Sequence, residues 1–144
     1  MSATEEQSGS AGVTPRDMSK RSMAAIEAKD RDGWLVLFAE DAVVEDPIGP
    51  SMLDPEGRGH RGHGAIGRFF DDVIAPNDKI TFKIDLSYQA GPEVANVGTI
   101  DITFPGGKQI ASVDLVSTYR IGPDGRLESL RAYWEPEQMR VRDA

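Results

Sequence analysis

Hydrophobic residues recur at two different spacings along this chain, and the spacing changes near residue 78. Before that point the clearest pattern has apolar residues three and four positions apart, at Ile66, Phe69, Phe70, Val73 and Ile74. This spacing places them on one face of an amphipathic helix. From Ile80 to Tyr88 apolar and polar residues alternate instead, which is the period of a half-buried strand. The pattern therefore predicts helices followed by strands.

Two further helices are predicted ahead of the one at residue 66. Thr14 is a good N-cap, Pro15 suits the first helical position, and Asp17 places a negative charge in the first turn. This helix is expected to run to about Lys29. Asp30 then caps a second, short helix, whose core-facing residues are Trp34, Leu35, Leu37 and Phe38.

Long strands make up the second half of the chain. Glycine- and proline-containing turns are predicted near residues 91–92, 105–107 and 122–125. They separate strands expected at residues 80–88, 94–104, 109–121 and 127–135. The fold class is α+β, with three N-terminal helices packed on a strongly curved, mostly antiparallel sheet. We expect a disordered tail over residues 1–13 and a single domain over residues 14–140.

One short predicted strand, residues 42–46, carries the most informative side chain. It ends at Pro47, because proline cannot donate a hydrogen bond to a strand ladder. Strand side chains alternate, so Asp46 shares a face with the apolar Val44. A carboxylate in that position is either a solvated rim group or a buried group with a use, since burial without a partner is costly. We favour a functional role for Asp46.

The segment after this strand, residues 49–64, is predicted to be a long polar loop. Loops of this length in compact domains are often functional lids. His60 and His63 fall within it and are expected to be surface residues.

Composition narrows the classes of function. The 144 residues carry a net charge of −8 and no cysteine, so nucleic acid, disulfides and thiolate metal sites are not expected. With two histidines, a multi-histidine metal site is not expected either, and no cofactor or metal is predicted. The absence of an apolar span and of a signal-peptide pattern predicts a cytoplasmic protein with no membrane partner.

Three stretches of the sequence resemble bacterial ketosteroid isomerases: residues 30–49, 62–70 and 125–134. These enzymes belong to the NTF2-like/SnoaL-like superfamily, and the resemblance covers about residues 15–136. It implies a cone of helices against a bent sheet, a small hydrophobic ligand of steroid-like or polycyclic type, and a homodimer. We expect the dimer to pack through the outer sheet face that carries Thr99, Asp101 and Thr103.

Carried over by position, the resemblance makes Asp46 the base that moves a proton between carbons of a 3-oxo-Δ5-steroid. The family's two donors to the enolate oxygen, a tyrosine and a protonated aspartate, align here with Ser22 and Ser117. The alternative is that both serines are small polar residues bonded to nearby backbone, with no role at the enolate oxygen. Tyr119 shares a strand face with Ser117 and is the best substitute donor, ahead of Tyr88.

The expected pocket is apolar. Asp46 should point into a cavity lined by residues that also belong to the core, namely Phe69, Ile100, Ile102, Leu130 and Trp134. Asp85 and Asp101 fall on the polar faces of their strands, and Asp114 lies on the face opposite Ser117.

Three functions fit these features. The first is a ketosteroid isomerase-like enzyme with Asp46 as proton shuttle, in which the atypical donors predict weak or absent isomerisation beside measurable steroid binding. The second is an epoxide hydrolase or cyclase of polyketide type, which needs a second acid. The third is a non-catalytic binder of steroid-like molecules.

Overall fold

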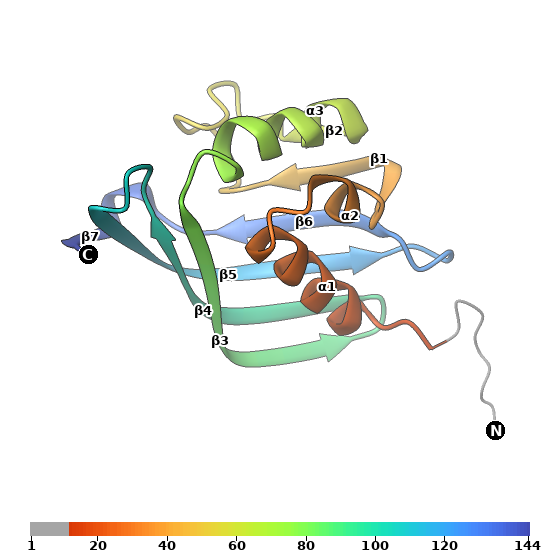
Figure 1. The fold of residues 1–144 in the computed structure, drawn as a ribbon. Coiled ribbons are helices and arrows are strands. Elements are labelled where there is room, and N and C mark those ends of the chain that lie inside the picture. The colour runs from red at the N-terminus through yellow and green to blue at the C-terminus, as the bar shows by residue number, and fades with distance from the viewer. Residues whose placement is uncertain (1–11) are drawn as a thin grey trace.

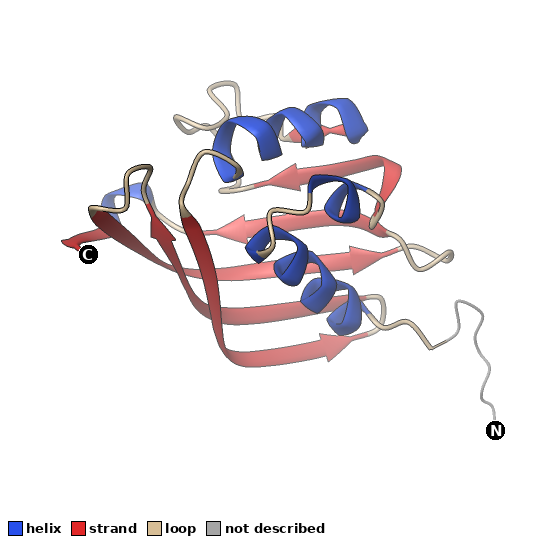
Figure 2. Cartoon of the chain, in the orientation of Figure 1, coloured by secondary structure: helices blue, strands red, loops and turns tan. Residues whose placement is uncertain are grey.

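The computed structural model describes residues 12–144 and shows helices on the concave face of a curved sheet (Figures 1 and 2). The predicted α+β fold is confirmed. The helices are α1 (Pro15–Glu27), α2 (Arg31–Leu35) and α3 (Gly62–Phe69), with a π-helical turn η1 (Phe70–Ile74) and a late 3₁₀ turn η2 (Pro136–Gln138). Most of the predicted tail lies outside the described residues, but Val13 packs against the core.

The sheet has seven strands: β1 (Phe38–Glu45), β2 (His60–Arg61), β3 (Lys79–Ala90), β4 (Glu93–Thr103), β5 (Gln109–Ile121), β6 (Leu127–Tyr133) and β7 (Arg140–Asp143). Their order is β2-β1-β6-β5-β4-β3, and β7 pairs with the first four residues of β5, Gln109–Ser112. All pairs are antiparallel except β1 with β6, which run parallel. The carboxyl ends of β1 and β6 therefore lie at the same edge.

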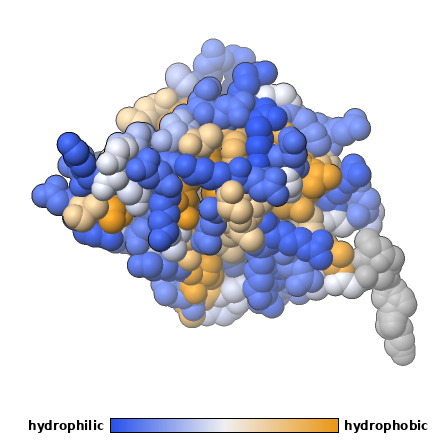
Figure 3. All heavy atoms as spheres, viewed as in Figure 1, coloured by the Kyte–Doolittle hydropathy of each residue, from blue (hydrophilic) through white to orange (hydrophobic). Residues whose placement is uncertain are grey.

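The first two helices begin where the sequence predicted. Thr14 and Asp17 form a reciprocal capping box, and the side chain of Asp30 accepts a hydrogen bond from the Gly33 amide at the start of α2. The helices bury Met18, Ile26 and Trp34 against the concave face of the sheet. On the face shown in Figure 3 the surface is largely hydrophilic, and apolar residues appear only in separate patches.

The structure departs from the prediction in the following places. Phe38 opens β1 rather than closing a helix, the segment predicted as loop contains β2 and the start of α3, and β7 follows the last predicted strand. β2 and β7 are too short to show an alternating pattern, and both form only because a partner strand lies alongside. The prediction that His60 and His63 belong to a loop is wrong, since His60 lies in β2 and His63 in the first turn of α3. Both residues are half-buried.

The sharp bend of β3 and β4 in Figure 1 has a local cause. The register between the two strands shifts between Ile84 and Leu86, which marks a β-bulge. Opposite the bulge lies Gly98, where an added Cβ would collide with the Lys83 carbonyl oxygen. Beyond the bulge the predicted inward alternation ends, and Leu86 and Tyr88 are exposed. The bend curves the sheet around the helices and forms the inside of the cone.

No helix among residues 12–144 is long and apolar enough to cross a membrane.

Candidate active site

Asp46 follows the last residue of β1 and points to the inside of the cone. Val44, two residues before it, is fully buried on the same face. The Trp134 indole nitrogen donates a hydrogen bond of 2.6 Å to Asp46 Oδ1. Burial raises the pKa of the Asp46 carboxyl, while the Trp134 hydrogen bond and the charge of His60 act in the opposite direction. The site thus holds one carboxyl in a partly desolvated position with few polar partners.

The carboxyl lines an apolar cavity of about 90 Å³. Helical residues from α1 to η1 form one wall, and the inward residues of β3 to β6 form the other. The predicted pocket residues Phe69, Ile100, Ile102 and Leu130 all line it, together with Ile26, Trp34, Ile80 and Phe82. Trp134 does not line this cavity, because its ring lies in a neighbouring groove with Pro47 and Ile48 and reaches Asp46 only through the indole nitrogen.

The three remaining predicted site residues meet inside the cone. Ser117 and Tyr119 line the cavity with Asp46, and Ser22 approaches from α1. All three are almost fully buried. Burial raises the pKa of the Tyr119 phenol, and hydrogen bonds with the Ser22 and Ser117 hydroxyls oppose that rise only in part. Tyr119 is therefore a neutral phenol, able to donate a hydrogen bond inside an apolar cavity.

His60 is the residue that sequence reasoning missed. It pairs with Val44 across β1 and β2, so it shares the sheet face of Asp46, and its ring centroid lies 4.7 Å from that of Phe69. Within residues 12–144, His60 Nε2 is the buried side-chain nitrogen or oxygen that has no hydrogen-bond partner. No pattern along the chain indicates this position of His60, because it depends on the two-residue strand β2.

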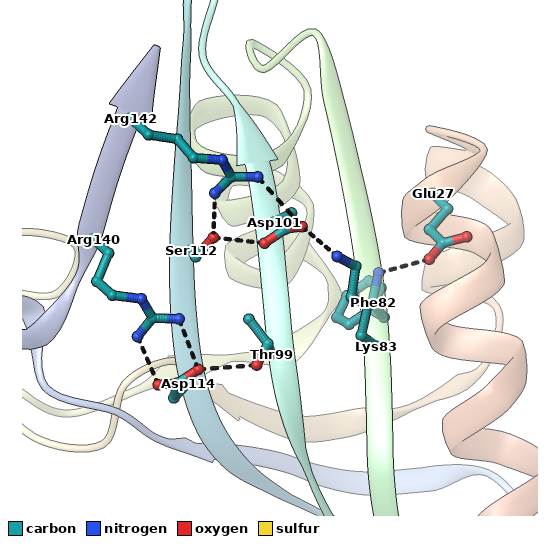
Figure 4. A network of polar contacts seen from close by, with 9 residues as sticks. All are labelled: Glu27, Phe82, Lys83, Thr99, Asp101, Ser112, Asp114, Arg140 and Arg142. Carbon is teal, nitrogen blue, oxygen red and sulfur yellow. Dashed lines mark hydrogen bonds and ion pairs between the residues drawn. The ribbon is translucent and has the colours of Figure 1, made fainter. Parts of the chain in front are cut away.

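The outer face of the sheet carries a separate network of charges (Figure 4). Arg140 of β7 binds Asp114, which also accepts a hydrogen bond from Thr99. Asp101 accepts from Ser112 and pairs with Lys83 over 2.9 Å. These aspartates face away from the cavity, as the alternation of strand side chains predicted. None of them serves as a second acid beside Asp46.

One partly buried carboxyl thus lines an apolar cavity inside an α+β cone, an arrangement typical of sites for small hydrophobic molecules. Comparison with known proteins identifies the protein family. The model of the SnoaL-like domain matches residues 20–130, so the chain belongs to the SnoaL-like family of the NTF2-like superfamily.

The individual relatives include two steroid isomerases and a protein that was solved with a bound steroid derivative. A steroid Delta-isomerase of Nocardioides simplex is 28% identical over 110 residues, which cover 75% of this chain and 79% of that protein. The Delta 5-3-ketosteroid isomerase of a Mycobacterium species matches with a TM-score of 0.84 and 35% identity, covering 89% of this chain and 98% of that one. RV0760c of Mycobacterium tuberculosis, solved in complex with estradiol-17beta-hemisuccinate, matches at 0.81 and 36% identity, covering 88% and 97%.

Proposed function

We propose that this protein binds a steroid-like ketone in the Asp46 cavity and moves its carbon–carbon double bond into conjugation with the carbonyl group. The observation that carries the proposal is the placement of Asp46 and Tyr119 in one apolar cavity. The isomerase relatives support the choice of substrate class.

The reaction needs one base and one hydrogen-bond donor. The Asp46 carboxylate takes a proton from the carbon between the ketone and the double bond, which leaves a dienolate. The Tyr119 hydroxyl donates to the dienolate oxygen and stabilises the charge that develops there. Protonated Asp46 then returns the same proton to the far end of the dienolate, so no atom is gained or lost.

The same residues account for the ionisation that this chemistry requires. A base must be mostly ionised at the working pH yet basic enough to remove a proton. Burial raises the pKa of Asp46, and the Trp134 hydrogen bond keeps that rise in check. The hydroxyl of Tyr119 stays protonated, because its pKa is raised above its ordinary value. The Tyr119 hydroxyl is thus available as a donor, and the Trp134 hydrogen bond favours the ionised form of Asp46 that acts as the base.

The cavity must widen when a ligand enters. Its volume of about 90 Å³ is smaller than the roughly 300–1000 Å³ of most small-molecule sites. Among its lining residues Val73, Asn77 and Phe82 are half-buried. We propose that these side chains move aside to admit the steroid.

Steady-state turnover of a 3-oxo-Δ5-steroid by the wild type, Asp46→Asn and Tyr119→Phe tests the proposal. Removing a well-placed oxyanion donor costs roughly 100- to 1000-fold in kcat, and this is the loss expected for Tyr119→Phe. Asp46→Asn should abolish turnover but retain binding. Turnover that Asp46→Asn leaves unchanged excludes the proposed chemistry, and micromolar binding without wild-type turnover supports a non-catalytic binder.

A further inference from the structure

The Asn77 side chain brings an amide to a part of the Asp46 cavity that is otherwise lined by apolar residues. Asn77 follows the η1 turn, and the lining residues around it are Val73, Ile74 and Ile102. The proposed reaction makes no use of this amide, and Asn77 is half-buried. A few polar groups in an apolar cavity fix the orientation of a ligand, so Asn77 is a candidate for recognising the substrate.

Asn77 and Tyr119 lie toward opposite ends of β4. The backbone N–H of Asp78 donates a hydrogen bond of 2.9 Å to the carbonyl oxygen of Thr103, the last residue of β4. Tyr119 instead pairs with Val94, the second residue of that strand. Because the same cavity reaches both residues, a ligand that places its ketone at Tyr119 and extends along the cavity brings its far end to Asn77.

Two hydrogen bonds orient the amide. Asn77 Nδ2 lies 2.8 Å from the Val73 carbonyl oxygen and 3.4 Å from that of Ile74. Both are carbonyl groups at the end of a helical turn, which need donors from outside the turn. Since these neighbours can only accept, the amide nitrogen faces them and Oδ1 is left as an acceptor. No group among residues 12–144 donates a hydrogen bond to Oδ1, and this oxygen is accessible rather than fully enclosed.

We infer that Asn77 Oδ1 accepts a hydrogen bond from a hydroxyl group at the far end of the ligand. This inference rests on the proposed function and narrows its substrate class to a 3-oxosteroid with a hydroxyl group on the five-membered ring. A ketone on that ring has no proton to donate, so two acceptor oxygens would face each other in an apolar cavity. When the cavity widens, the amide moves together with η1, because its nitrogen is bonded to two carbonyl groups of that turn.

Calorimetric titration with testosterone and androstenedione tests the inference. The two steroids differ only in the hydroxyl or ketone group on the five-membered ring, and both carry the same conjugated 3-ketone. Contacts at Tyr119 and Asp46 therefore cancel in the ratio of the two dissociation constants, and no turnover is needed. The wild type should bind testosterone roughly fivefold more tightly, about the worth of one neutral hydrogen bond. Asn77→Ala should remove this preference.

Val73→Ala is the matched control, because Val73 lines the same part of the cavity without a polar group. It should change both affinities by the same factor and keep their ratio. If Asn77 only caps η1, Asn77→Ala weakens the binding of both steroids equally, and urea unfolding measures the loss of the cap.

The outcomes separate this inference from the proposed function. Equal affinity of the wild type for the two steroids, or a preference that Asn77→Ala retains, overturns the inference and leaves the proposed function standing. The wild-type comparison decides this even where a variant fails to fold. A wild type that binds neither steroid contradicts the proposed function, and the inference fails with it.

Discussion

The Trp134 indole nitrogen lies 2.6 Å from the Asp46 carboxylate, and this contact is set by the register of two parallel strands. Glu45 of β1 pairs with Arg131 of β6, so the two parallel strands end at the same edge of the sheet. Asp46 is the first residue after β1, and Trp134 is the first residue after β6. A donor is thus fixed beside the proposed base by backbone pairing.

Trp134→Phe should raise the pKa of Asp46. The substitution removes the hydrogen bond that stabilises the carboxylate, while the burial that raises the pKa remains. A rate that depends on ionised Asp46 should therefore reach its plateau at a higher pH. The pH dependence of kcat/KM measures this, and an acidic limb that stays in place or moves to lower pH contradicts the role given to Trp134.

Asp46→Asn should stabilise the fold at neutral pH. A carboxyl whose pKa is raised on folding contributes stability below its unfolded pKa and loses it as the pH rises through the folded pKa. At neutral pH the charge is a cost, and its removal should raise the free energy of unfolding by roughly 1 kcal/mol, as is common when an active-site strain is relieved. Urea unfolding at pH 7 and pH 4 measures the difference, which should shrink at the lower pH.

Asp114→Asn is the control for that experiment. Arg140 and Thr99 lower the pKa of the exposed Asp114 carboxyl, so its ionised form is the favoured one in the folded state. Its stability contribution is present above the unfolded pKa and is lost as the pH falls through the folded pKa. Asp114→Asn should therefore not stabilise the protein at pH 7, and equal stabilisation by both substitutions would show that burial of Asp46 is not the cause.

Gly98→Ala should destabilise the fold and distort the bend of the sheet. The new methyl group would meet the Lys83 backbone at the bulge, which cannot move aside as a flexible side chain can. We expect a loss of about 2 kcal/mol or more, in the range of other overpacked sites. Gly64→Ala is the control, because its Cβ would lie 3.6 Å from the Arg68 side chain in an exposed turn of α3. It should stabilise by up to roughly 1 kcal/mol, and thermal or urea unfolding compares the two.

The homodimer remains a prediction. The outer face holds Thr99, Asp101 and Thr103, and the charges there are mostly satisfied by the arginines of β7 (Figure 4). Thr99→Arg should then weaken dimers, since it places an extra cation in the proposed interface. Sedimentation at micromolar concentration measures the assembly. A wild-type protein that sediments only as a monomer rules out this interface.

The sequence predicted the parts of the fold and site that depend on local periodicity. The alternation that places Val44 with Asp46, and Ser117 with Tyr119, follows from strand geometry alone. The spacing of apolar residues from Ile66 to Ile74 predicted the helical segment that covers the cavity. Each of these patterns can be recognised from the order of residues along the chain.

The features that were missed depend on contacts between distant segments. β2 has two residues and exists through its pairing with β1, so the position of His60 beside the Asp46 face could not be read locally. The inward alternation predicted through Tyr88 fails at a bulge that Gly98, on the next strand, makes possible. The buried hydrogen bond from Trp34 to Ser22 joins two helices that no single periodicity connects.

The most direct test is a structure of the protein with a planar phenolic steroid such as estradiol. The account predicts that the steroid lies in the cavity between Phe69 and Ile100, with its phenolic oxygen within hydrogen-bond distance of the Tyr119 hydroxyl and beside the Asp46 carboxyl. A steroid bound with its oxygen away from both groups, or bound outside the cone, would contradict the central claim.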